Sequence, residues 1–427
     1  MRGLLILPLM LVGCPSAAPK AGSGPSASAE HAAPSATSSA SAAGSPSAVP
    51  SSAASTDASA DTSPVDVRAE ARARGATWLV EPGTRNFDNF AVGGAFLVWN
   101  ESDVIARVRK TGGPIVETHA SGAESLIVDA THAFWRESYG GCPKDDAPDS
   151  PRCRPFGYRF MKVALGGGSA SVLHAGMPNI PEALAVDDRY LYWFDGTSEY
   201  DVKRVRRVDK KGGASTTLAD KQRYGFGFQF DGADVFWATY EETKGKPGEI
   251  LQMPRTGGKP TAVVKGLEKP GAVVVDGGAL FWSHAGGVLQ TMPKAGGAIV
   301  TLGSDTTDPM RLFSFEVDAA SVYFVEHASP ETRIRRVARA GGEPETLVAE
   351  RMALSLRTVD DRHVYWIAFE PKNGPQHVRR MAKPNGAVEE IFLAPGASST
   401  SEAVHVETDA DAVYLVGPGG GILRLKR

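Results

Sequence analysis

The chain has 427 residues, and its 46 basic and 49 acidic side chains give a formal net charge of -3 at pH 7. This balance excludes the strongly basic surface that is typical of nucleic-acid-binding proteins. The length suffices for two ordinary domains or for one large closed domain, and only 3 cysteines are present.

The first 13 residues have the pattern of an export signal. Arg2 precedes an apolar run, Leu4 to Val12, which is too short to span a bilayer as a helix. The run ends in Leu-Val-Gly-Cys at Cys14, which resembles a bacterial lipobox, in which the cysteine is lipidated and becomes the first mature residue. The resemblance implies a lipid anchor, and Pro15 rather than Asp after the cysteine implies, by resemblance to enteric lipoproteins, the outer membrane. An ordinary secretory signal that contains a cysteine is the alternative.

Residues 14–65 are almost wholly Ser, Ala, Pro, Gly and Thr, without an aromatic residue. Such a composition cannot bury enough apolar surface to offset the entropy lost on ordering. We therefore expect a disordered tether, followed by a folded part over residues 76–427. Together with the lipobox, the tether predicts an exported protein that is anchored to the bacterial cell envelope.

A short pattern recurs along residues 76–427. An apolar run ends in Asp, and Trp or another large apolar residue follows six positions later. The pairs are Asp129 with Trp135, Asp187 with Trp193, Asp231 with Trp237, Asp276 with Trp282, Asp318 with Phe324, Asp360 with Trp366, and Asp409 with Leu415, while one more copy has Gly93 with Trp99. Such regular recurrence is the signature of a repeat architecture.

Each unit is predicted to form four short antiparallel strands. The run before Asp, for example Val273 to Val275, is the first strand, and the Asp carboxylate closes a turn by accepting backbone N–H bonds. The second strand, such as Ala279 to Trp282, contains the aromatic and branched residues that strands prefer. A third strand leads to a diglycine, such as Gly296-Gly297, which adopts positive φ and closes a hairpin into the fourth strand, Ile299 to Leu302.

The first two strands of each unit are apolar on both alternating faces, so both faces of each sheet must be covered. Radially packed four-stranded sheets cover one another in this way, which predicts an all-β fold, a β-propeller. Counting the units gives eight blades, or seven if one degenerate copy is miscounted. The last unit lacks a fourth strand, and Trp78 to Gly83 resembles the fourth-strand ending Ile391 to Gly396, so we expect an N-terminal strand to close the ring.

The second strands also carry a family resemblance. Leu191-Tyr192-Trp193, Val322-Tyr323-Phe324 and Val364-Tyr365-Trp366, each after an Asp-containing turn, resemble the YWTD propellers of lipoprotein-receptor type and, more loosely, TolB-like bacterial propellers. The Thr-Asp half of that motif is absent and the YWTD family has six blades, so no ligand-binding residue is carried over. The resemblance implies the propeller fold and protein binding.

One face of the predicted disc carries the Asp and diglycine turns. We interpret the Asp series as turn formers and the Trp series as core between blades. A basic residue stands close before each diglycine or its equivalent: Lys110, Lys210, Arg255, Lys294, Arg339, Lys383 and, in the last unit, Arg427. These charges either keep the outer strands soluble and unpaired, or form a positive ring that meets anionic lipid or polysaccharide.

The opposite face carries loops of variable length, where binding on a rigid scaffold usually resides. The candidate binding residues form an acidic, partly aromatic rim: Asp88, Glu124, Asp145, Asp146, Asp149, Glu182, Asp195, Glu199, Tyr200, Asp201, Tyr240, Glu241, Glu242 and Glu326. Solvated surface charge is the alternative interpretation. Calcium suits clustered oxygen ligands, although no loop has the D-x-D-x-D-G spacing, and no other cofactor is predicted.

Cys142 and Cys153 lie in one polar insertion, GGCPKDDAPDSPRC. In an exported protein, two such close cysteines predict a disulfide that closes the loop. A metal site is the alternative, but no second cysteine pair or neighbouring histidine completes a ligand set.

The sequence contains no H-E-x-x-H, no G-x-S-x-G and no zinc-ligand spacing. A propeller can still assemble a site from separate loops, as the virginiamycin lyase type does with histidines, and His284 and His327 in adjacent loops are the candidate catalytic pair. The sequence thus predicts an envelope lipoprotein whose propeller binds a protein or glycan partner. An enzyme of lyase or hydrolase type, acting on an envelope or extracellular substrate, is the alternative.

Overall fold

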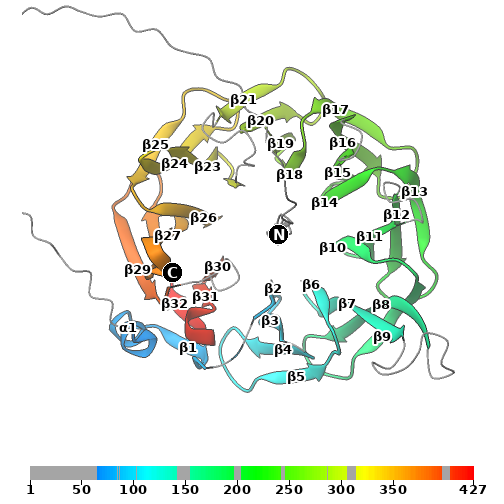
Figure 1. Cartoon of the computed structure of the whole chain (residues 1–427), viewed down its shortest axis with the longest axis horizontal. Coiled ribbons are helices and arrows are strands. Elements are labelled where there is room, and N and C mark those ends of the chain that lie inside the picture. Colours follow the sequence, from blue (N-terminus) through cyan, green and yellow to red (C-terminus); the bar gives the residue numbers. More distant parts are fainter. Residues whose placement is uncertain are drawn as a thin grey trace, which may run out of the picture. The chain divides into compact units, whose positions relative to one another are not determined.

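The structure is a computed structural model that describes residues 65–83, 85, 87–101, 103–141, 154–196, 203–241, 246–285, 287–304, 314–396 and 404–427. The strands of residues 65–427 form eight four-stranded antiparallel sheets arranged in a ring (Figure 1). This folded part is an eight-bladed β-propeller, so the predicted fold and the count of eight are confirmed. Among the described residues, no helix is long and apolar enough to cross a membrane.

The first four blades follow the predicted strand order, from the innermost strand to the outermost. Blade 1 contains β2 (Asn89–Gly93), β3 (Phe96–Glu101), β4 (Val104–Arg109) and β5 (Val116–His119). Blade 2 contains β6 (Glu124–Val128), β7 (His132–Gly141), β8 (Arg154–Ala164) and β9 (Ser171–Met177). Blade 3 contains β10 (Pro181–Val186), β11 (Tyr190–Gly196), β12 (Lys203–Asp209) and β13 (Thr216–Gln222). Blade 4 contains β14 (Tyr224–Asp231), β15 (Asp234–Glu241), β16 (Lys246–Pro254) and β17 (Thr261–Leu267).

The last four blades repeat this order, except that blade 8 takes its outer strand from the N-terminal side of the ring. Blade 5 contains β18 (Pro270–Asp276), β19 (Ala279–His284), β20 (Val288–Pro293) and β21 (Val300–Ser304). Blade 6 contains β22 (Phe315–Val317), β23 (Ser321–Ala328), β24 (Glu331–Ala338) and β25 (Glu345–Glu350). Blade 7 contains β26 (Ala353–Val359), β27 (His363–Phe369), β28 (Gln376–Ala382) and β29 (Val388–Ala394). Blade 8 contains β30 (His405–Thr408), β31 (Ala412–Val416), β32 (Ile422–Lys426) and β1 (Thr77–Val80).

The ring is closed by β1, as predicted. This strand pairs antiparallel with β32, placing Thr77 opposite Arg424 and Trp78 opposite Leu423. The two ends of the propeller therefore share one sheet, and separating them requires the backbone hydrogen bonds of that sheet to break.

A short helix, α1 (Val67–Ala73), precedes β1 and was not predicted from the sequence. Asp66 caps it by accepting N–H bonds from Arg68 and Ala69. The helix packs against β29 of blade 7, where the backbone N–H of Leu393 donates to Glu70 Oε1 at 3.3 Å. The chain thus contacts blade 7 through α1 before it enters blade 8 through β1. This helix contact joins the N-terminal segment to the ring in addition to the closing strand.

The core consists of eight apolar clusters, each shared by two successive blades. For example, Trp135 of blade 2 packs with Val98 and Ile105 of blade 1. The predicted core series is at most 1% exposed: Trp99, Trp135, Trp193, Trp237, Trp282, Phe324, Trp366 and Leu415. Burial of each such side chain contributes about 1.5–3 kcal/mol, so the interfaces between blades hold the ring together.

The strand order gives the disc two different faces. The turn face carries the first-to-second and third-to-fourth strand turns, and the loop face carries the second-to-third connections and the crossovers between blades. The diglycine prediction is confirmed on the turn face, where Gly296 has φ 91° and Gly297 has φ 143°. The seventh unit is an exception, because neither Asn385 nor Gly386 has a positive φ.

Candidate functional site

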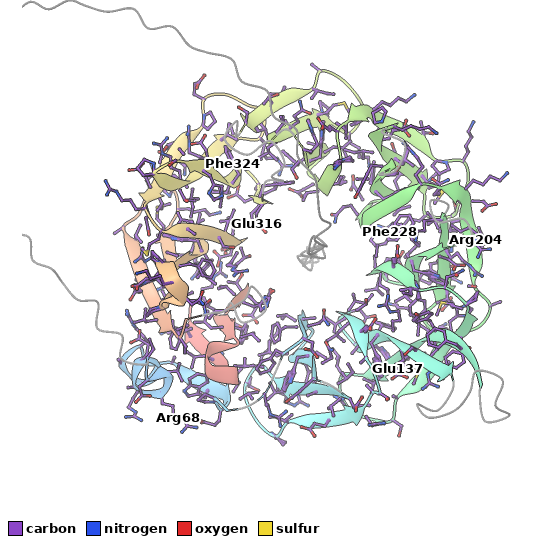
Figure 2. The ribbon with its side chains drawn as sticks, in the orientation of Figure 1. Arg68, Glu137, Arg204, Phe228, Glu316 and Phe324 are labelled. Carbon is purple, nitrogen blue, oxygen red and sulfur yellow. The ribbon has the colours of Figure 1, made fainter. Side chains whose placement is uncertain are left out.

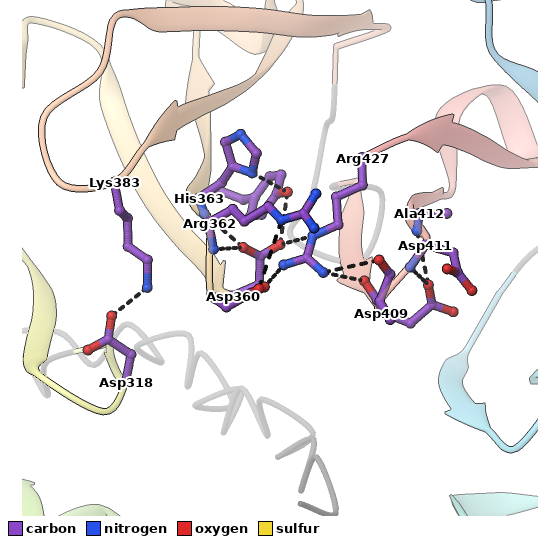
Figure 3. Close-up of polar contacts among 12 residues, drawn as sticks. Asp318, Asp360, Arg362, His363, Lys383, Asp409, Asp411, Ala412 and Arg427 are labelled. Atoms are coloured by element: carbon purple, nitrogen blue, oxygen red, sulfur yellow. Dashed lines mark hydrogen bonds and ion pairs between the residues drawn. The ribbon is translucent and has the colours of Figure 1, made fainter.

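The Asp and basic series of the repeat meet on the turn face. Asp360 shows the arrangement (Figure 3): its Oδ1 accepts the backbone N–H groups of Arg362 and His363, both at 2.7 Å. Its Oδ2 accepts the Tyr365 hydroxyl at 3.0 Å and lies 2.9 Å from Nε of Arg427 in blade 8. One carboxylate therefore closes a turn within its own blade and binds a cation from the next.

The same ion pair recurs around the ring, and each base pairs with the turn Asp of the preceding blade. The pairs are Lys110–Asp409 at 3.1 Å, Lys210–Asp129 at 2.7 Å, Arg255–Asp187 at 3.4 Å, Lys294–Asp231 at 2.7 Å, Arg339–Asp276 at 2.5 Å, Lys383–Asp318 at 2.5 Å and Arg427–Asp360 at 2.9 Å. They join residues that are far apart in sequence but adjacent across a blade interface.

These contacts settle the roles of both series. The turn-forming role is confirmed at Asp129, Asp187, Asp318, Asp360 and Asp409, whose Oδ1 atoms each accept N–H bonds from two and three residues further along. The expectation of free edge charges or of a positive ring is wrong, because each cation is half-buried and neutralised by a carboxylate.

The pairing also shows in the acidity of the carboxyl groups. Burial by itself would raise the pKa of Asp318, but the hydrogen bonds from Lys383 and from the backbone of Ala320 and Ser321 hold that pKa below its usual range. The pKa of Asp129 and of Asp360 is lowered in the same way, with burial opposing the hydrogen bonds of base and backbone. These carboxylates are therefore ionised throughout the physiological pH range.

The interface between blades 1 and 2 lacks both members of the pair. Gly93 stands where the other blades have Asp, and Leu165 stands where they have the basic residue. The position of Leu165 is equivalent because its backbone N–H donates to the carbonyl of Thr131, as the N–H of Lys210 donates to the carbonyl of Arg189 in the next blade. A Cβ on Gly93 would lie only 2.7 Å from the backbone oxygen of Asp129. Close backbone packing replaces the ion pair here, together with a 3.0 Å bond from Nε of buried Arg107 to the Leu165 carbonyl.

On the loop face, four of the predicted acidic residues lie beside basic side chains. Asp195 is only 1% exposed and is held by two arginines. The pairs are Glu124 with Arg136, Glu182 with Lys203 at 3.1 Å, Asp195 with Arg204 at 2.7 Å and with Arg206 at 2.9 Å, and Glu326 with Arg335 at 2.7 Å. This part of the face is a mixture of both charges, and the acidic rim that was expected is offset by neighbouring cations.

The remaining predicted residues are distributed as follows. At the start of blade 1, the backbone N–H of Asp88 donates to the carbonyl of Asn100 at 3.1 Å. In blade 4, Tyr240 pairs in register with Tyr224 of β14, and Glu241 pairs in register with Lys246 of β16. The others lie outside the described residues: Cys14, Cys142, Asp145, Asp146, Asp149, Cys153, Glu199, Tyr200, Asp201 and Glu242. The lipidation, the disulfide and the binding role of these residues stay predictions.

The two candidate histidines lie on successive blades. His284 ends β19, and its Nδ1 lies 2.7 Å from the carbonyl oxygen of Ala285. His327 lies in β23, with Nδ1 3.4 Å from the Thr332 hydroxyl oxygen. Over the ranges that the structure covers, no group of three His, Cys, Asp or Glu side chains is placed to hold a metal ion.

The innermost strands carry a charged group that the sequence interpretation missed. Glu316 lies on β22, Arg357 on β26, and His405 and Glu407 on β30, in three successive blades; we call these four residues the channel-wall cluster. Figure 2 shows Glu316 at the inner edge of the ring. Along β30, buried Val406 alternates with exposed His405 and partly exposed Glu407. Because this strand is the innermost of its blade, these side chains open on the central channel.

Partial burial perturbs the acidity of the channel-wall cluster. Burial raises the pKa of Glu316 to about 8, and the nearby Glu407 carboxylate adds to this effect. Burial also raises the pKa of Glu407 to about 7 and lowers the pKa of Arg357 to about 10. Loss of solvent around the imidazole ring on the channel wall, and then the Arg357 cation, lower the pKa of His405. Clustered titratable groups with such shifts are typical of binding or catalytic sites.

Comparison with known proteins supports the fold. No family model and no curated protein matches the chain. Among solved structures, it is similar to the computationally designed Ika8 protein, with TM-score 0.56 and 11% identity over 82% of this chain and 98% of that chain. It is also similar to a prolyl endopeptidase, with TM-score 0.51 and 11% identity over 78% of this chain and 54% of that chain. At such low identity the likeness shows the β-propeller fold alone.

Proposed function

We propose that this protein is an envelope lipoprotein whose propeller is a rigid binding platform for a protein or glycan partner. The observation that carries the proposal is the difference between the two faces. The turn face is closed by the repeated Asp–base pairs between short turns. The loop face varies: β7 and β8 of blade 2 have 10 and 11 residues, whereas β3 and β4 of blade 1 have 6 each. Variable extensions on a rigid ring are where binding usually resides.

The ion pairs of the loop face support this function. Buried Asp195 holds the partly exposed Arg204 in a fixed position at the strand ends. A partner that meets preordered charges loses little side-chain entropy on binding, and complementary charge gives it orientation and specificity. The Asp–Tyr turns further favour a YWTD-like or TolB-like repeat, because the hydroxyls of Tyr192, Tyr323, Tyr365 and Tyr414 each donate to a turn Asp.

The platform is tested by in-cell crosslinking and mass spectrometry. The test variant replaces Asp145, Asp146, Glu199, Glu241 and Glu242 by Ala, and the control variant replaces the exposed residues Asp188, Glu343 and Asp411, which lie away from the loop face. We expect a partner that wild type and control capture and that the loop variant loses. Capture that is unchanged in the loop variant would contradict the proposal.

The anchor is tested separately through Cys14, in the segment with the lipobox-like sequence. Cys14→Ser should release the protein from the membrane fraction and abolish incorporation of a labelled fatty acid, because no thiol remains to be acylated. A variant that still sediments with membranes and carries label would overturn the lipoprotein assignment and leave the propeller platform intact.

A lyase or hydrolase is the second candidate, and the geometry of His284 favours it. When Nδ1 donates its proton to the Ala285 carbonyl, the neutral ring keeps a lone pair on Nε2, which can then accept a proton from a substrate. On this alternative, purified protein turns over an envelope polysaccharide or peptide and His284→Ala abolishes the turnover. Equal turnover by both forms would remove His284 from any mechanism.

A further inference from the structure

The channel-wall cluster breaks the symmetry of the ring. Glu316 and Glu407 lie directly opposite Tyr323 and Tyr414 of the adjoining strands, and Arg357 occupies a bulge next to the corresponding position of blade 7. The equivalent positions of the other five blades hold neutral side chains: Ala91, Ile127, Ala185, Gln229 and Val274. Ionisable side chains at or next to this position of the innermost strand are thus confined to three successive blades.

The cluster also departs from how charge is handled elsewhere in the protein. The half-buried charges of the turn-face series are paired, and so are Glu182, Asp195 and Glu326 on the loop face. Within the described residues, by contrast, the carboxyl groups of Glu316 and Glu407 have no hydrogen-bond or ion-pair partner. The Arg357 guanidinium likewise has no hydrogen-bond or ion-pair partner among the described residues, and its Nε atom is buried. Without a partner, burial keeps Glu316 largely protonated at neutral pH, whereas a bound cationic group would stabilise both Glu316 and Glu407 as carboxylates, which indicates that the groups serve a ligand.

The cluster has an acidic side, Glu316 and Glu407, and a basic side, on which Arg357 carries the charge. Glu316 and Glu407 interact electrostatically with each other, and Arg357 acts on His405. Described side chains form no three-ligand metal site, and Arg357 would repel a metal cation. A small organic molecule with both charges fits this arrangement better.

We propose that the channel-wall cluster binds a small zwitterionic ligand, with an ammonium group held by Glu316 and Glu407 and a carboxylate held by Arg357. Ammonium donates to two carboxylates, and the guanidinium offers several donors to one carboxylate, so each charge of the ligand is met by charge-assisted hydrogen bonds. Amino acids and short peptides carry this pair of groups. The inference concerns a site apart from the loop face and goes beyond the proposed platform function.

The test is calorimetric titration of the protein with zwitterions of increasing charge separation: glycine, β-alanine, γ-aminobutyrate and glycylglycine. We expect at least one to bind more tightly than about 1 mM. For the tightest, the N-acetylated form and the C-terminal amide each keep one charge, and each should bind at least about tenfold more weakly.

The residues are tested with Glu316→Gln/Glu407→Gln and with Arg357→Gln, which should each weaken binding at least about tenfold. Glu343→Gln, the same carboxylate-to-amide change at an exposed turn, is the matched control and should bind as wild type does. If the double variant fails to fold, judged by its melting temperature, the two single variants give the same comparison.

The proposal is overturned if no zwitterion binds wild type, or if binding is equal in the cluster variants and the control. Its failure is distinct from failure of the platform, because the cluster variants keep the loop face intact and should capture the same crosslinked partner as wild type.

Discussion

At the scale of single residues, the turn Asp performs two tasks that the repeat alone does not connect. Its Oδ1 closes the turn, and its Oδ2 binds a cation from the next blade, as Asp318 does with Lys383. Closure of the turn is local, and it was predictable from the sequence because each Asp precedes small or polar residues. The second depends on a residue 65 positions further along the chain, which no local pattern reveals.

Asp318→Asn should lower the free energy of unfolding by about 1–2 kcal/mol, because the amide can still accept the turn N–H bonds but loses the charge-assisted bond to Lys383. Denaturant unfolding measures the loss. Lys383→Met in the same background should then cost little more, since its partner is already gone. A double-mutant cycle with no coupling between the two positions would contradict a stabilising pair.

The same carboxylates predict loss of stability in acid. Because the folded-state pKa of Asp318 is lowered, its stabilising contribution is complete above the unfolded pKa of about 3.9 and is lost as pH falls through the lower folded value. Unfolding followed between about pH 5 and pH 2 should therefore be less pH-dependent in Asp318→Asn than in wild type. Equal pH dependence in the two proteins would disprove the assignment.

At the scale of elements, strand β1 decides whether the ring stays closed. It supplies the outer strand of blade 8 and buries Val80, which is 3% exposed, while α1 packs on blade 7. The closing strand was predicted from the missing fourth strand of the last unit. The helix was not, because seven residues without a strong apolar period are helical only when packing supports them.

Deleting residues 78–82 should lower the free energy of unfolding by about 5 kcal/mol, since it exposes the edge of β32 and removes the burial of several apolar side chains. Deleting residues 20–60, in the segment predicted to be a tether, should leave the melting temperature unchanged. Both are read from thermal unfolding, and equal effects of the two deletions would show that β1 does not hold the ring.

At the scale of the whole molecule, one interface departs from the repeat. Blades 1 and 2 have glycine and leucine in place of Asp and base, and their backbones approach too closely for a Cβ at Gly93. This close approach explains why position 93 is glycine rather than Asp, which the sequence pattern shows only as an irregular copy. The ring of eight blades thus closes with close backbone packing in place of the ion pair at one interface.

Gly93→Asp, which would restore the repeat, should destabilise the protein by about 1–3 kcal/mol, because the new Cβ would lie 2.7 Å from the backbone oxygen of Asp129. Adding Leu165→Lys should not rescue it, since buried Leu165 belongs to the core cluster of this interface. The melting temperature checks both variants, and a rise on Gly93→Asp would refute the close-packing explanation.

The sequence by itself determined the propeller, the eight blades, the closing strand and the buried second-strand aromatics, because each depends on spacing within one unit and on its repetition. The three-dimensional arrangement alone decided which charges meet. Lys383 and Asp318 belong to different units, and Glu316, Arg357 and Glu407 come together only because blades 6, 7 and 8 are neighbours around the channel. Within one unit, Asp195 meets Arg204 only because β11 and β12 pair as a hairpin. Contacts between units depend on how successive blades pack against each other, so a pattern considered one unit at a time cannot contain them.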